Sequence, residues 1–300
     1  METVWRPTHQ VELHRTIGQL GHGRRDPTFR VEPDRSIWRT TNAPTGPATV
    51  RLVQRGGHEV HAEAWGPGAD WVIAGVPDLL GAGDDLEGFV PGHPLVDRTH
   101  RSHPWLRLSR SNLVFESLVP AILEQKVTGL EANRAFARLT ARYGTTPPGP
   151  APLGMVIPPP PEVWQRIPSW EWHKAGVQPP QSKTVIAAAR LAARLEEAVT
   201  LPADQALARL RAVPGVGEWT AAEVAQRAWG SPDAISVGDF HLAAFVGWAL
   251  LGKPIDDAAM VELLEPWRGH RQRVVRLLEL SGAHKPKFAP RLTIADHRAI

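Results

Sequence analysis

The chain has 300 residues, of which 42% are hydrophobic, and a formal net charge of +3, so it is long enough for two domains and apolar enough for a core. Cysteine is absent, which excludes disulfides, thiolate zinc sites, a cysteine nucleophile and cysteine-held iron–sulfur clusters. No apolar run reaches about 18 residues, so we expect neither a signal peptide nor a membrane span, and we expect a cytoplasmic protein.

Residues 36–75 predict a small antiparallel sheet. Four short runs, SIWRTT, ATVRLVQRG, HEVHAEAWG and DWVIAG, partly alternate between apolar and polar residues and are separated by turns rich in Pro, Gly and Asn. A helical turn near residues 77–80 is expected to cap this sheet. We therefore assign residues 1–100 to a β-rich amino-terminal domain.

Residues 101–300 predict a helical domain. Apolar residues recur at helical spacing in the segments 112–125, 130–143, 182–199, 203–213, 218–229, 240–251, 256–264 and 270–280. Eight prolines lie between residues 145 and 161, so this stretch is a long connection that is either extended over the surface or partly disordered. The predicted fold class is α+β in separate blocks, a small antiparallel sheet followed by an all-α bundle of about eight helices.

The carboxy-terminal tail is basic. Residues 266–300 hold eight Arg or Lys against one Glu and one Asp, a net charge of +6, whereas the other 265 residues sum to −3. The sequence pI near 9.6 is a weak indication of an anionic partner. A solvated basic face and a phosphate-contacting surface are both compatible with this excess.

The segment 213–217, Val-Pro-Gly-Val-Gly, joins two predicted helices through a very short turn. Gly215 and Gly217 let other groups approach the backbone closely, and the amides that start the second helix face outward with the positive end of its dipole. A phosphate can bind there without a basic side chain. The alternative is an ordinary helical hairpin with a Gly-rich turn.

The run LRAVPGVGEWTAAEVAQRAWG, followed by SPDAISVGDFHLAAFVGWAL, resembles the helix-hairpin-helix DNA glycosylases, with their Gly/Pro-rich loop and downstream Asp. The likeness is to the alkylation-repair branch, the 3-methyladenine DNA glycosylase II proteins, which also carry an amino-terminal β-rich block. Two further stretches, ESLVPAILEQKVTGLEANRAFARLTARYG and PWRGHRQRVVRLLELSG, resemble the helix pair that carries the family's DNA wedge and its closing helix. The likeness spans roughly residues 100–282 and is specific from the hairpin to the Asp.

The resemblance implies how the hairpin holds double-stranded DNA. The residues that it places on DNA here are Pro214, Gly215, Val216 and Gly217. It also implies that backbone carbonyls around Arg211, Val213 and Val216 bind a monovalent cation, a structural Na⁺ or K⁺, which bridges to a DNA phosphate. No side-chain metal site and no required cofactor are implied.

Asp239 follows Ser-Val-Gly and opens the predicted helix 240–251. Its simplest role is to cap that helix, since Asp accepts hydrogen bonds from free amides there. A carboxylate anion held at a helix start can also stabilise the oxocarbenium-like transition state of glycoside cleavage, or orient the attacking water. The two roles are compatible, and the family resemblance favours Asp239 as the catalytic residue.

Trp219 bears on both the reaction and the pocket. Some relatives have a lysine two residues past the second hairpin glycine, which forms a Schiff base and then cuts the strand; Trp219 stands there in this chain, which implies a monofunctional enzyme. Trp219 would also line the base pocket, because an aromatic face attracts a cationic alkylated base; a core tryptophan is the alternative. Where the alkylation branch carries further aromatics, this chain has Glu223 and Arg276, which predicts a more polar pocket with an ion pair.

A glycosylase rotates its target base out of the helix, and a side chain fills the gap. The candidates are Gln125 and Lys126, in the turn before Val127. The alternative is that both are surface residues at a helix end. Relatives often have an apolar wedge here, so a lysine departs from their pattern.

The sequence therefore predicts a monomeric DNA glycosylase of base excision repair that hydrolyses the N-glycosidic bond of damaged bases, above all alkylated purines, in duplex DNA. In a prokaryote it would be associated with the nucleoid. The alternatives are a glycosylase for oxidised or deaminated bases and a non-catalytic helix-hairpin-helix DNA-binding protein. Asp239 separates these readings, because a pure binding module does not need it.

Overall fold

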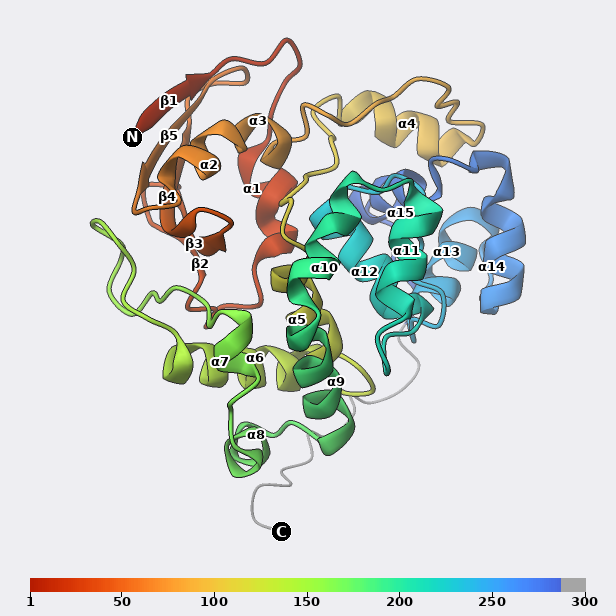
Figure 1. Cartoon of the computed structure of the whole chain (residues 1–300). Coiled ribbons are helices and arrows are strands. Elements are labelled where there is room, and N and C mark those ends of the chain that lie inside the picture. Colours follow the sequence, from red (N-terminus) through yellow and green to blue (C-terminus); the bar gives the residue numbers. More distant parts are fainter. Residues whose placement is uncertain (287–300) are drawn as a thin grey trace.

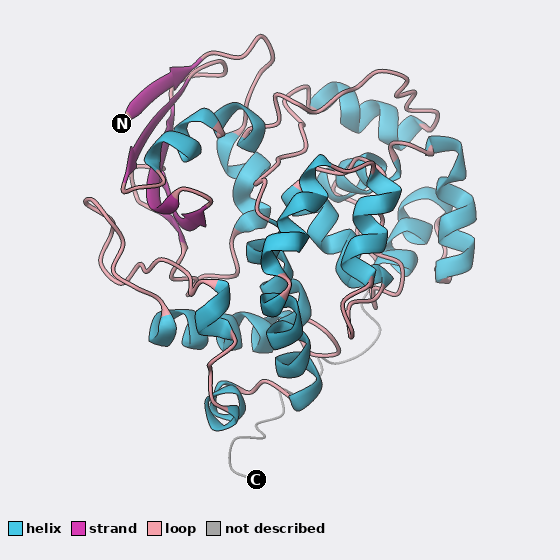
Figure 2. Cartoon of the chain, in the orientation of Figure 1, coloured by secondary structure: helices cyan, strands magenta, loops and turns pink. Residues whose placement is uncertain are grey.

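The fold has two parts, a five-stranded sheet on one side and a larger helical body (Figures 1 and 2). The computed structural model describes residues 1–286. Lys287, Arg291 and Arg298 of the predicted basic tail lie outside the described residues. Within residues 1–286, no helix has both the length and the apolar character that spanning a membrane requires.

The sheet is antiparallel throughout, in the order β1-β5-β4-β3-β2. Alternate residues of its central strands, such as Val50, Leu52 and Ala62, are buried, because one face of a strand carries every second side chain. They form one core with a short helix and with the helices that follow the sheet. The strands are β1 (Glu2–Trp5), β2 (Phe29–Val31), β3 (Ile37–Ala43), β4 (Gly46–Gln54) and β5 (Val60–Trp65), and the helices are α1 (Leu13–Ile17), α2 (Ala69–Ala74) and α3 (Val76–Leu79).

The expected sheet is confirmed in part. The first three predicted runs are β3, β4 and β5, and the predicted helical turn is α3. The fourth run, DWVIAG, is not a strand and forms most of α2. Its buried residues, Ala69 and Val72, are three apart, which is the spacing of a helix face that covers β4 and β5. The strands β1 and β2 are only four and three residues long and were not predicted.

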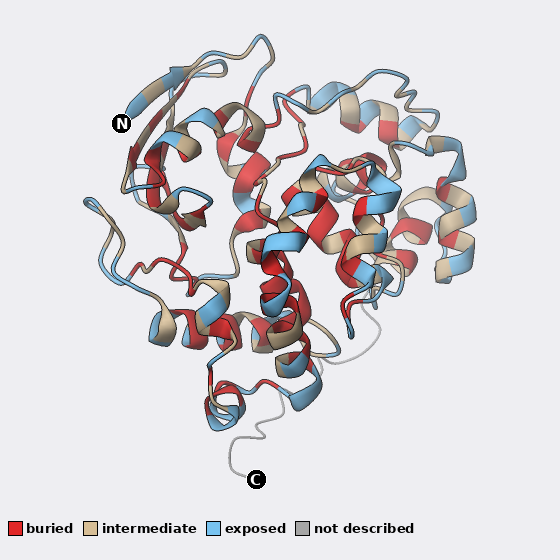
Figure 3. Cartoon of the chain, in the orientation of Figure 1, coloured by how far each residue is buried: buried red, intermediate tan, exposed pale blue. Residues whose placement is uncertain are grey.

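The helical body is built around one buried helix. The helices are α4 (Pro94–Ser102), α5 (Val114–Leu123), α6 (Gly129–Tyr143), α7 (Pro161–Trp164), α8 (Ser169–Ala175), α9 (Pro179–Arg190), α10 (Ala192–Glu196), α11 (Ala203–Arg211), α12 (Glu218–Ala228), α13 (Leu242–Leu251), α14 (Asp257–Leu264) and α15 (Arg271–Leu280). Short 3₁₀ turns cover Gly18–Leu20, Glu197–Thr200 and Glu265–Trp267. Every residue of α5 except Glu116 is buried (Figure 3), and α12 and α9 pack against it. All the predicted helical segments contain helix, whereas α4, α7 and α8 were not predicted.

The domain boundary predicted near residue 100 falls inside α4. This helix packs on α15 and shares a core with α13, α14 and α15, which includes Val96, Met260 and Val274. The start of the helical body therefore lies against its end, and α4 belongs by its packing with the helices rather than with the sheet.

The Pro-rich connection between residues 145 and 161 is extended along the sheet. The Val156 amide donates to the Pro27 carbonyl at 2.9 Å, and the Asn42 side chain of β3 donates to the Pro158 carbonyl. Met155 and Ile157 are buried. Of the two forms expected for this connection, the structure has the extended one, because backbone and side-chain partners on the sheet satisfy its polar groups.

Ion pairs join the two parts of the molecule. The Arg39 guanidinium of β3 pairs with the Glu116 carboxylate of α5. Arg273 of α15 makes a two-pronged pair with Asp84, with nitrogen–oxygen distances of 2.8 and 2.6 Å, and both side chains are at most 2% exposed. A buried pair of this geometry holds α15 in register with the segment after α3, because loss of either partner leaves an uncompensated buried charge.

The described part of the basic tail is largely neutralised. Its four arginines are each paired with a carboxylate, namely Arg268 with Glu265, Arg271 with Asp233, Arg273 with Asp84 and Arg276 with Glu279. These pairs lie within α15 or tie it to its neighbours. The arginines of residues 266–286 thus have structural partners, and the phosphate-contacting interpretation gains no support from them.

Candidate functional site

The hairpin connects α11 to α12 and is anchored by its two valines. Val213 and Val216 are buried at 1% and 6% exposure, and the Val216 amide donates to the Val213 carbonyl at 3.0 Å. Pro214, Gly215 and Gly217 are exposed. The buried valines fix the turn against the helical core, while its backbone faces outward.

The two glycines of the hairpin serve different needs. Gly215 has φ +90°, and a Cβ there would lie 2.1 Å from the Thr184 hydroxyl of α9, so this position excludes any side chain. A Cβ on Gly217 would meet nothing within 4 Å. Gly215 is thus required by the fold, whereas Gly217 leaves open space in front of the turn.

The start of α12 has free amides. No side chain caps this helix, and the amides of Gly217, Glu218 and Trp219 donate no hydrogen bond within residues 1–286. Four amides at a helix start have no partner inside the helix, and they carry the positive end of its dipole. The exposed turn therefore offers donors to an anion.

Gln125 and Lys126, the expected wedge candidates, have different surroundings. The Gln125 side-chain amide donates to the Gly215 carbonyl and to the Thr220 hydroxyl, both at 2.9 Å. Lys126 is exposed and has φ +57°. Gln125 therefore braces the hairpin from the end of α5, and Lys126 is the member of the pair that is free to project beyond it.

Asp239 lies in the loop between α12 and α13 and is held at both oxygens. Its Oδ1 accepts the amides of His241 and Leu242 at 2.8 and 3.0 Å. Its Oδ2 accepts the indole Nε1–H of Trp219 at 3.2 Å. Helix α13 begins at Leu242, two residues later than predicted. The carboxylate thus caps α13 and at the same time contacts the first turn after the hairpin.

The polar neighbours of Trp219 differ from those expected. Glu223 pairs with Arg227, one turn later on α12, and accepts the Ser236 hydroxyl. Arg276 pairs with Glu279 on its own helix. The ion pair expected between Glu223 and Arg276 is therefore wrong, because each has an oppositely charged partner within one turn of helix.

Sequence reasoning missed three members of this cluster, namely Arg227, Ser236 and Glu124. The spacing of Glu223 and Arg227, four apart on one helix, was a usable signal for the first. Glu124 ends α5 beside the braced Gln125. Burial raises the pKa of the Glu124 carboxyl, nearby Glu223 and Asp239 raise it too, and Arg227 opposes them. Nothing in the sequence around Glu124 signals that it is buried beside Asp239.

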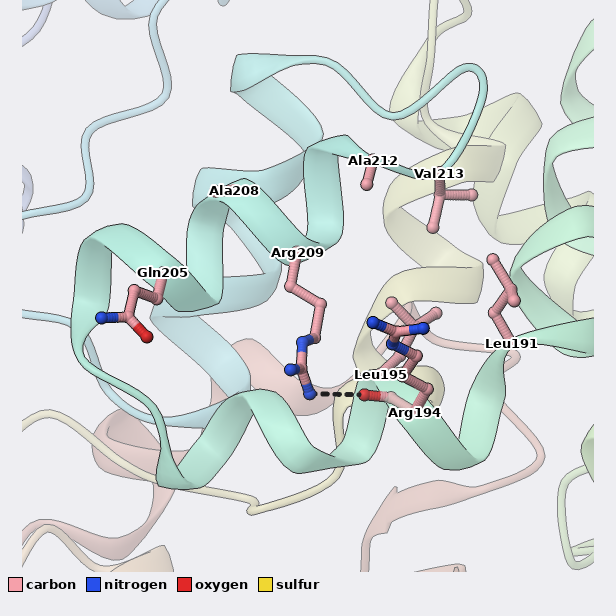
Figure 4. Close-up of a pocket in the computed structure, with 8 residues that line it drawn as sticks. All are labelled: Leu191, Arg194, Leu195, Gln205, Ala208, Arg209, Ala212 and Val213. Carbon is pink, nitrogen blue, oxygen red and sulfur yellow. Dashed lines mark hydrogen bonds between the residues drawn. The ribbon is translucent and has the colours of Figure 1, made fainter.

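Two cavities lie elsewhere. One of about 470 Å³ lies between α10 and α11 and ends at Val213; the Arg209 guanidinium crosses it to the Arg194 carbonyl at 3.1 Å (Figure 4). The other, of about 530 Å³, lies at the sheet beside Trp38 and Leu153. Neither is lined by Asp239 or Trp219, so the candidate site is defined by its hydrogen bonds and not by an enclosed cavity.

The chain was compared with known proteins. No family model matches it. Two curated relatives, each a probable bifunctional transcriptional activator/DNA repair enzyme AlkA from a strain of Mycobacterium tuberculosis, are 28% identical over 200 residues, which make up 65% of this chain and 37% of theirs. The chain thus matches little more than a third of the length of these relatives.

Solved structures resemble nearly the whole chain. A 3-methyladenine DNA-glycosylase from Archaeoglobus fulgidus aligns with a TM-score of 0.76 at 18% identity, over 93% of this chain and 98% of that one. An 8-oxoguanine glycosylase/lyase from Clostridium acetobutylicum aligns with a TM-score of 0.71 at 12% identity, over 94% and 96%. These likenesses confirm the predicted fold class, a small amino-terminal sheet followed by a helical glycosylase body.

Proposed function

We propose that this chain, which has the fold of the helix-hairpin-helix DNA glycosylases and resembles their alkylation-repair branch, is a DNA glycosylase that removes damaged bases from duplex DNA in base excision repair. The observation that carries the proposal is the hydrogen bond between Trp219 Nε1 and Asp239 Oδ2 at 3.2 Å. It joins the anion-binding turn to a carboxylate, so one stretch of DNA can contact both. We place this activity at cytoplasmic DNA and assign it to a monomer.

The turn before α12 binds the DNA backbone. Its free amides at Gly217, Glu218 and Trp219 donate to a phosphate, which explains how a chain of modest net charge holds DNA. The carbonyls of Arg211 and Val216 accept no hydrogen bond within residues 1–286, and that of Val213 accepts one. These free lone pairs fit a monovalent cation, Na⁺ or K⁺, which would supply a positive charge between the turn and the phosphate.

Asp239 carries the reaction. As the bond between the sugar and the base breaks, positive charge develops on the sugar, and a carboxylate beside it stabilises that charge or orients the attacking water. The amides of His241 and Leu242 and the indole of Trp219 hold the carboxylate in one orientation. A preoriented anion of this kind contributes on the order of 10²–10³-fold to a rate.

The substrate class is alkylated purines, and the product is an abasic site. The names of similar proteins, an AlkA DNA repair enzyme and a 3-methyladenine DNA-glycosylase, support this choice. The Trp219 indole offers its face to a cationic base. Trp219 also stands where a Schiff-base lysine would be, so the enzyme is monofunctional and leaves the strand intact. Lys126, exposed at the end of α5, fills the gap left by the base.

The test is base release from methylated duplex DNA, with alkali to cleave the abasic sites. We expect product from the natural protein and its loss in Asp239→Asn, with DNA binding retained in both. Equal product from Asp239→Asn would overturn the assignment of Asp239. Borohydride should trap no covalent protein–DNA adduct, and an adduct would contradict the monofunctional reaction.

Two alternatives are decided by the same assay. The similarity to an 8-oxoguanine glycosylase/lyase makes oxidised bases the second candidate class, and oligonucleotides that carry single defined lesions would reveal it. A non-catalytic binding protein would retain duplex DNA and release no base from any of them.

A further inference from the structure

Three carboxyl groups surround one arginine beside the proposed reaction centre. Glu124 stands at the end of α5, Glu223 lies in α12, and Asp239 lies in the loop before α13; electrostatic interactions connect Glu124 to both of the others and to Arg227. Arg227 pairs directly with Glu223. If all three carboxyls were ionised, the cluster would hold three negative charges against one positive charge in a largely buried place, which is costly.

The hydrogen bonds assign different states to the three carboxyls. Asp239 accepts two amides and an indole N–H, and Glu223 accepts from Arg227 and Ser236. The Glu124 carboxyl has no hydrogen-bond or ion-pair partner among residues 1–286. Donors stabilise the anionic form of the first two, so the proton that the crowded cluster needs belongs on Glu124.

The other groups near the cluster reinforce this assignment. Arg227 also donates to the Gln19 carbonyl and interacts with Glu279 of α15, so its charge is shared among several acceptors. His22, on the far side of Arg227, is fully buried, and burial followed by the charges of Arg227 and Arg39 lowers its pKa to about 3. An uncharged His22 near neutral pH leaves Glu124 as the group of this cluster that can release a proton.

We propose that Glu124 is the general acid that protonates the leaving base, and that the enzyme therefore excises neutral damaged purines in addition to cationic alkylated ones. This rests on the proposed glycosylase function. A cationic base leaves without help because it already carries the positive charge, whereas a neutral base must accept a proton as it departs. A pair of carboxyls with unlike environments, one acid and one anion, is the arrangement that glycoside hydrolysis needs.

The step balances without a further reactant. Glu124 gives its proton to a ring nitrogen of the purine, and the electron pair of the sugar–base bond goes to the base as that bond breaks. Water adds to the sugar carbon, and Asp239 takes the proton that the water loses. That proton passes to solvent, and Glu124 regains one from solvent, so the net reaction is hydrolysis to a free base and an abasic sugar.

The experiment compares two duplexes that differ in one base, hypoxanthine as the neutral purine and 7-methylguanine as the cationic one, in single-turnover assays. We expect the natural protein to release both bases. Glu124→Gln should lose hypoxanthine release by on the order of 10²-fold, the contribution of a general acid, and should keep 7-methylguanine release. Glu196→Gln is the matched control, since Glu196 is also a buried carboxyl with a raised pKa but caps α5 through the amides of Val114 and Phe115. It should leave the ratio of the two rates unchanged.

The pH profile supplies a second readout. Release of hypoxanthine by the natural protein should fall as pH rises through the raised pKa of Glu124, while release of 7-methylguanine should not show that limb, and Glu124→Gln should abolish it. The proposal is overturned if the natural protein removes 7-methylguanine but not hypoxanthine, or if Glu124→Gln slows both equally; in either case the glycosylase function stands. Release of neither base, from these or methylated duplexes, would defeat that function as well.

Discussion

Helices α12 and α13 both begin after a turn that contains a glycine with positive φ, yet their first amides are used in opposite ways. The turn before α12 leaves its amides without a partner among residues 1–286. In the turn before α13, the Asp239 carboxylate accepts the amides of His241 and Leu242. One helix start is open to an external anion, and the other holds an anion that belongs to the chain.

The difference shows how one local motif can serve two tasks. Free amides at a helix start bind a phosphate by backbone alone, so the residues in that turn need only be small. A carboxylate placed on such amides is fixed in position and favoured as an anion. Trp219 connects the two, because it stands on the first turn of α12 and donates to Asp239. The four predictions that follow alter one side of this pair at a time.

The largest effect is expected from the anion itself. Asp239→Asn and Asp239→Ala should both lower the rate of base release by on the order of 10²–10³-fold, because both remove the negative charge. Only the alanine should also lower the free energy of unfolding, by about 1 kcal/mol, since asparagine still caps a helix. Single-turnover rates and urea denaturation measure the two effects. A fully active Asp239→Asn would reduce Asp239 to a cap.

The open helix start is tested by its two glycines. Gly217→Ala should weaken binding to an abasic duplex about tenfold without loss of stability, since its Cβ meets no protein atom but would stand in the way of a phosphate. Gly215→Ala should weaken binding and also destabilise the protein, because its Cβ would clash with Thr184. Gly18→Ala is the control, with an equally open position away from the hairpin. Unchanged binding in Gly217→Ala would show that phosphate does not approach that turn.

The link between the two helix starts should have a smaller effect. Trp219→Phe keeps an aromatic ring but removes the indole N–H that donates to Asp239. One hydrogen bond contributes about 1 kcal/mol, so we expect a rate roughly fivefold lower, with DNA binding unchanged. If binding falls and the rate constant at saturating protein does not, Trp219 contacts DNA instead of orienting the carboxylate.

The smallest effect is expected at a third helix start, which serves as a reference. The Asp256 side chain caps α14 by accepting the Ala259 amide at 2.9 Å. Asp256→Ala should cost about 1 kcal/mol of stability and should leave the rate of base release and the affinity for DNA unchanged, as thermal denaturation and the same assays would record. A rate loss comparable to that of Asp239→Ala would mean that any capped helix start nearby affects the reaction, and the comparison would fail.

Most of the fold could be predicted from local patterns. Alternation identified β3, β4 and β5, and helical spacing identified α5, α6 and the helices from α9 to α15. The misassigned run DWVIAG is too short for its period to be decisive, and its contact with the sheet makes it a helix. Short elements such as β2 and α7 depend on neighbours that are distant in sequence, so no local pattern predicts them.

The sequence by itself determined the turn at residues 213–217, the position of Asp239 as a helix cap, and the absence of a lysine at Trp219, because these depend on residue type and local spacing. Tertiary structure alone decided which charges meet. Glu223 turned to Arg227 rather than Arg276, Gln125 became a brace for the hairpin, and Glu124 came to lie beside Asp239. The physical reason is that burial and charge pairing depend on distances between helices, and the packing of α5 against α12 sets those distances.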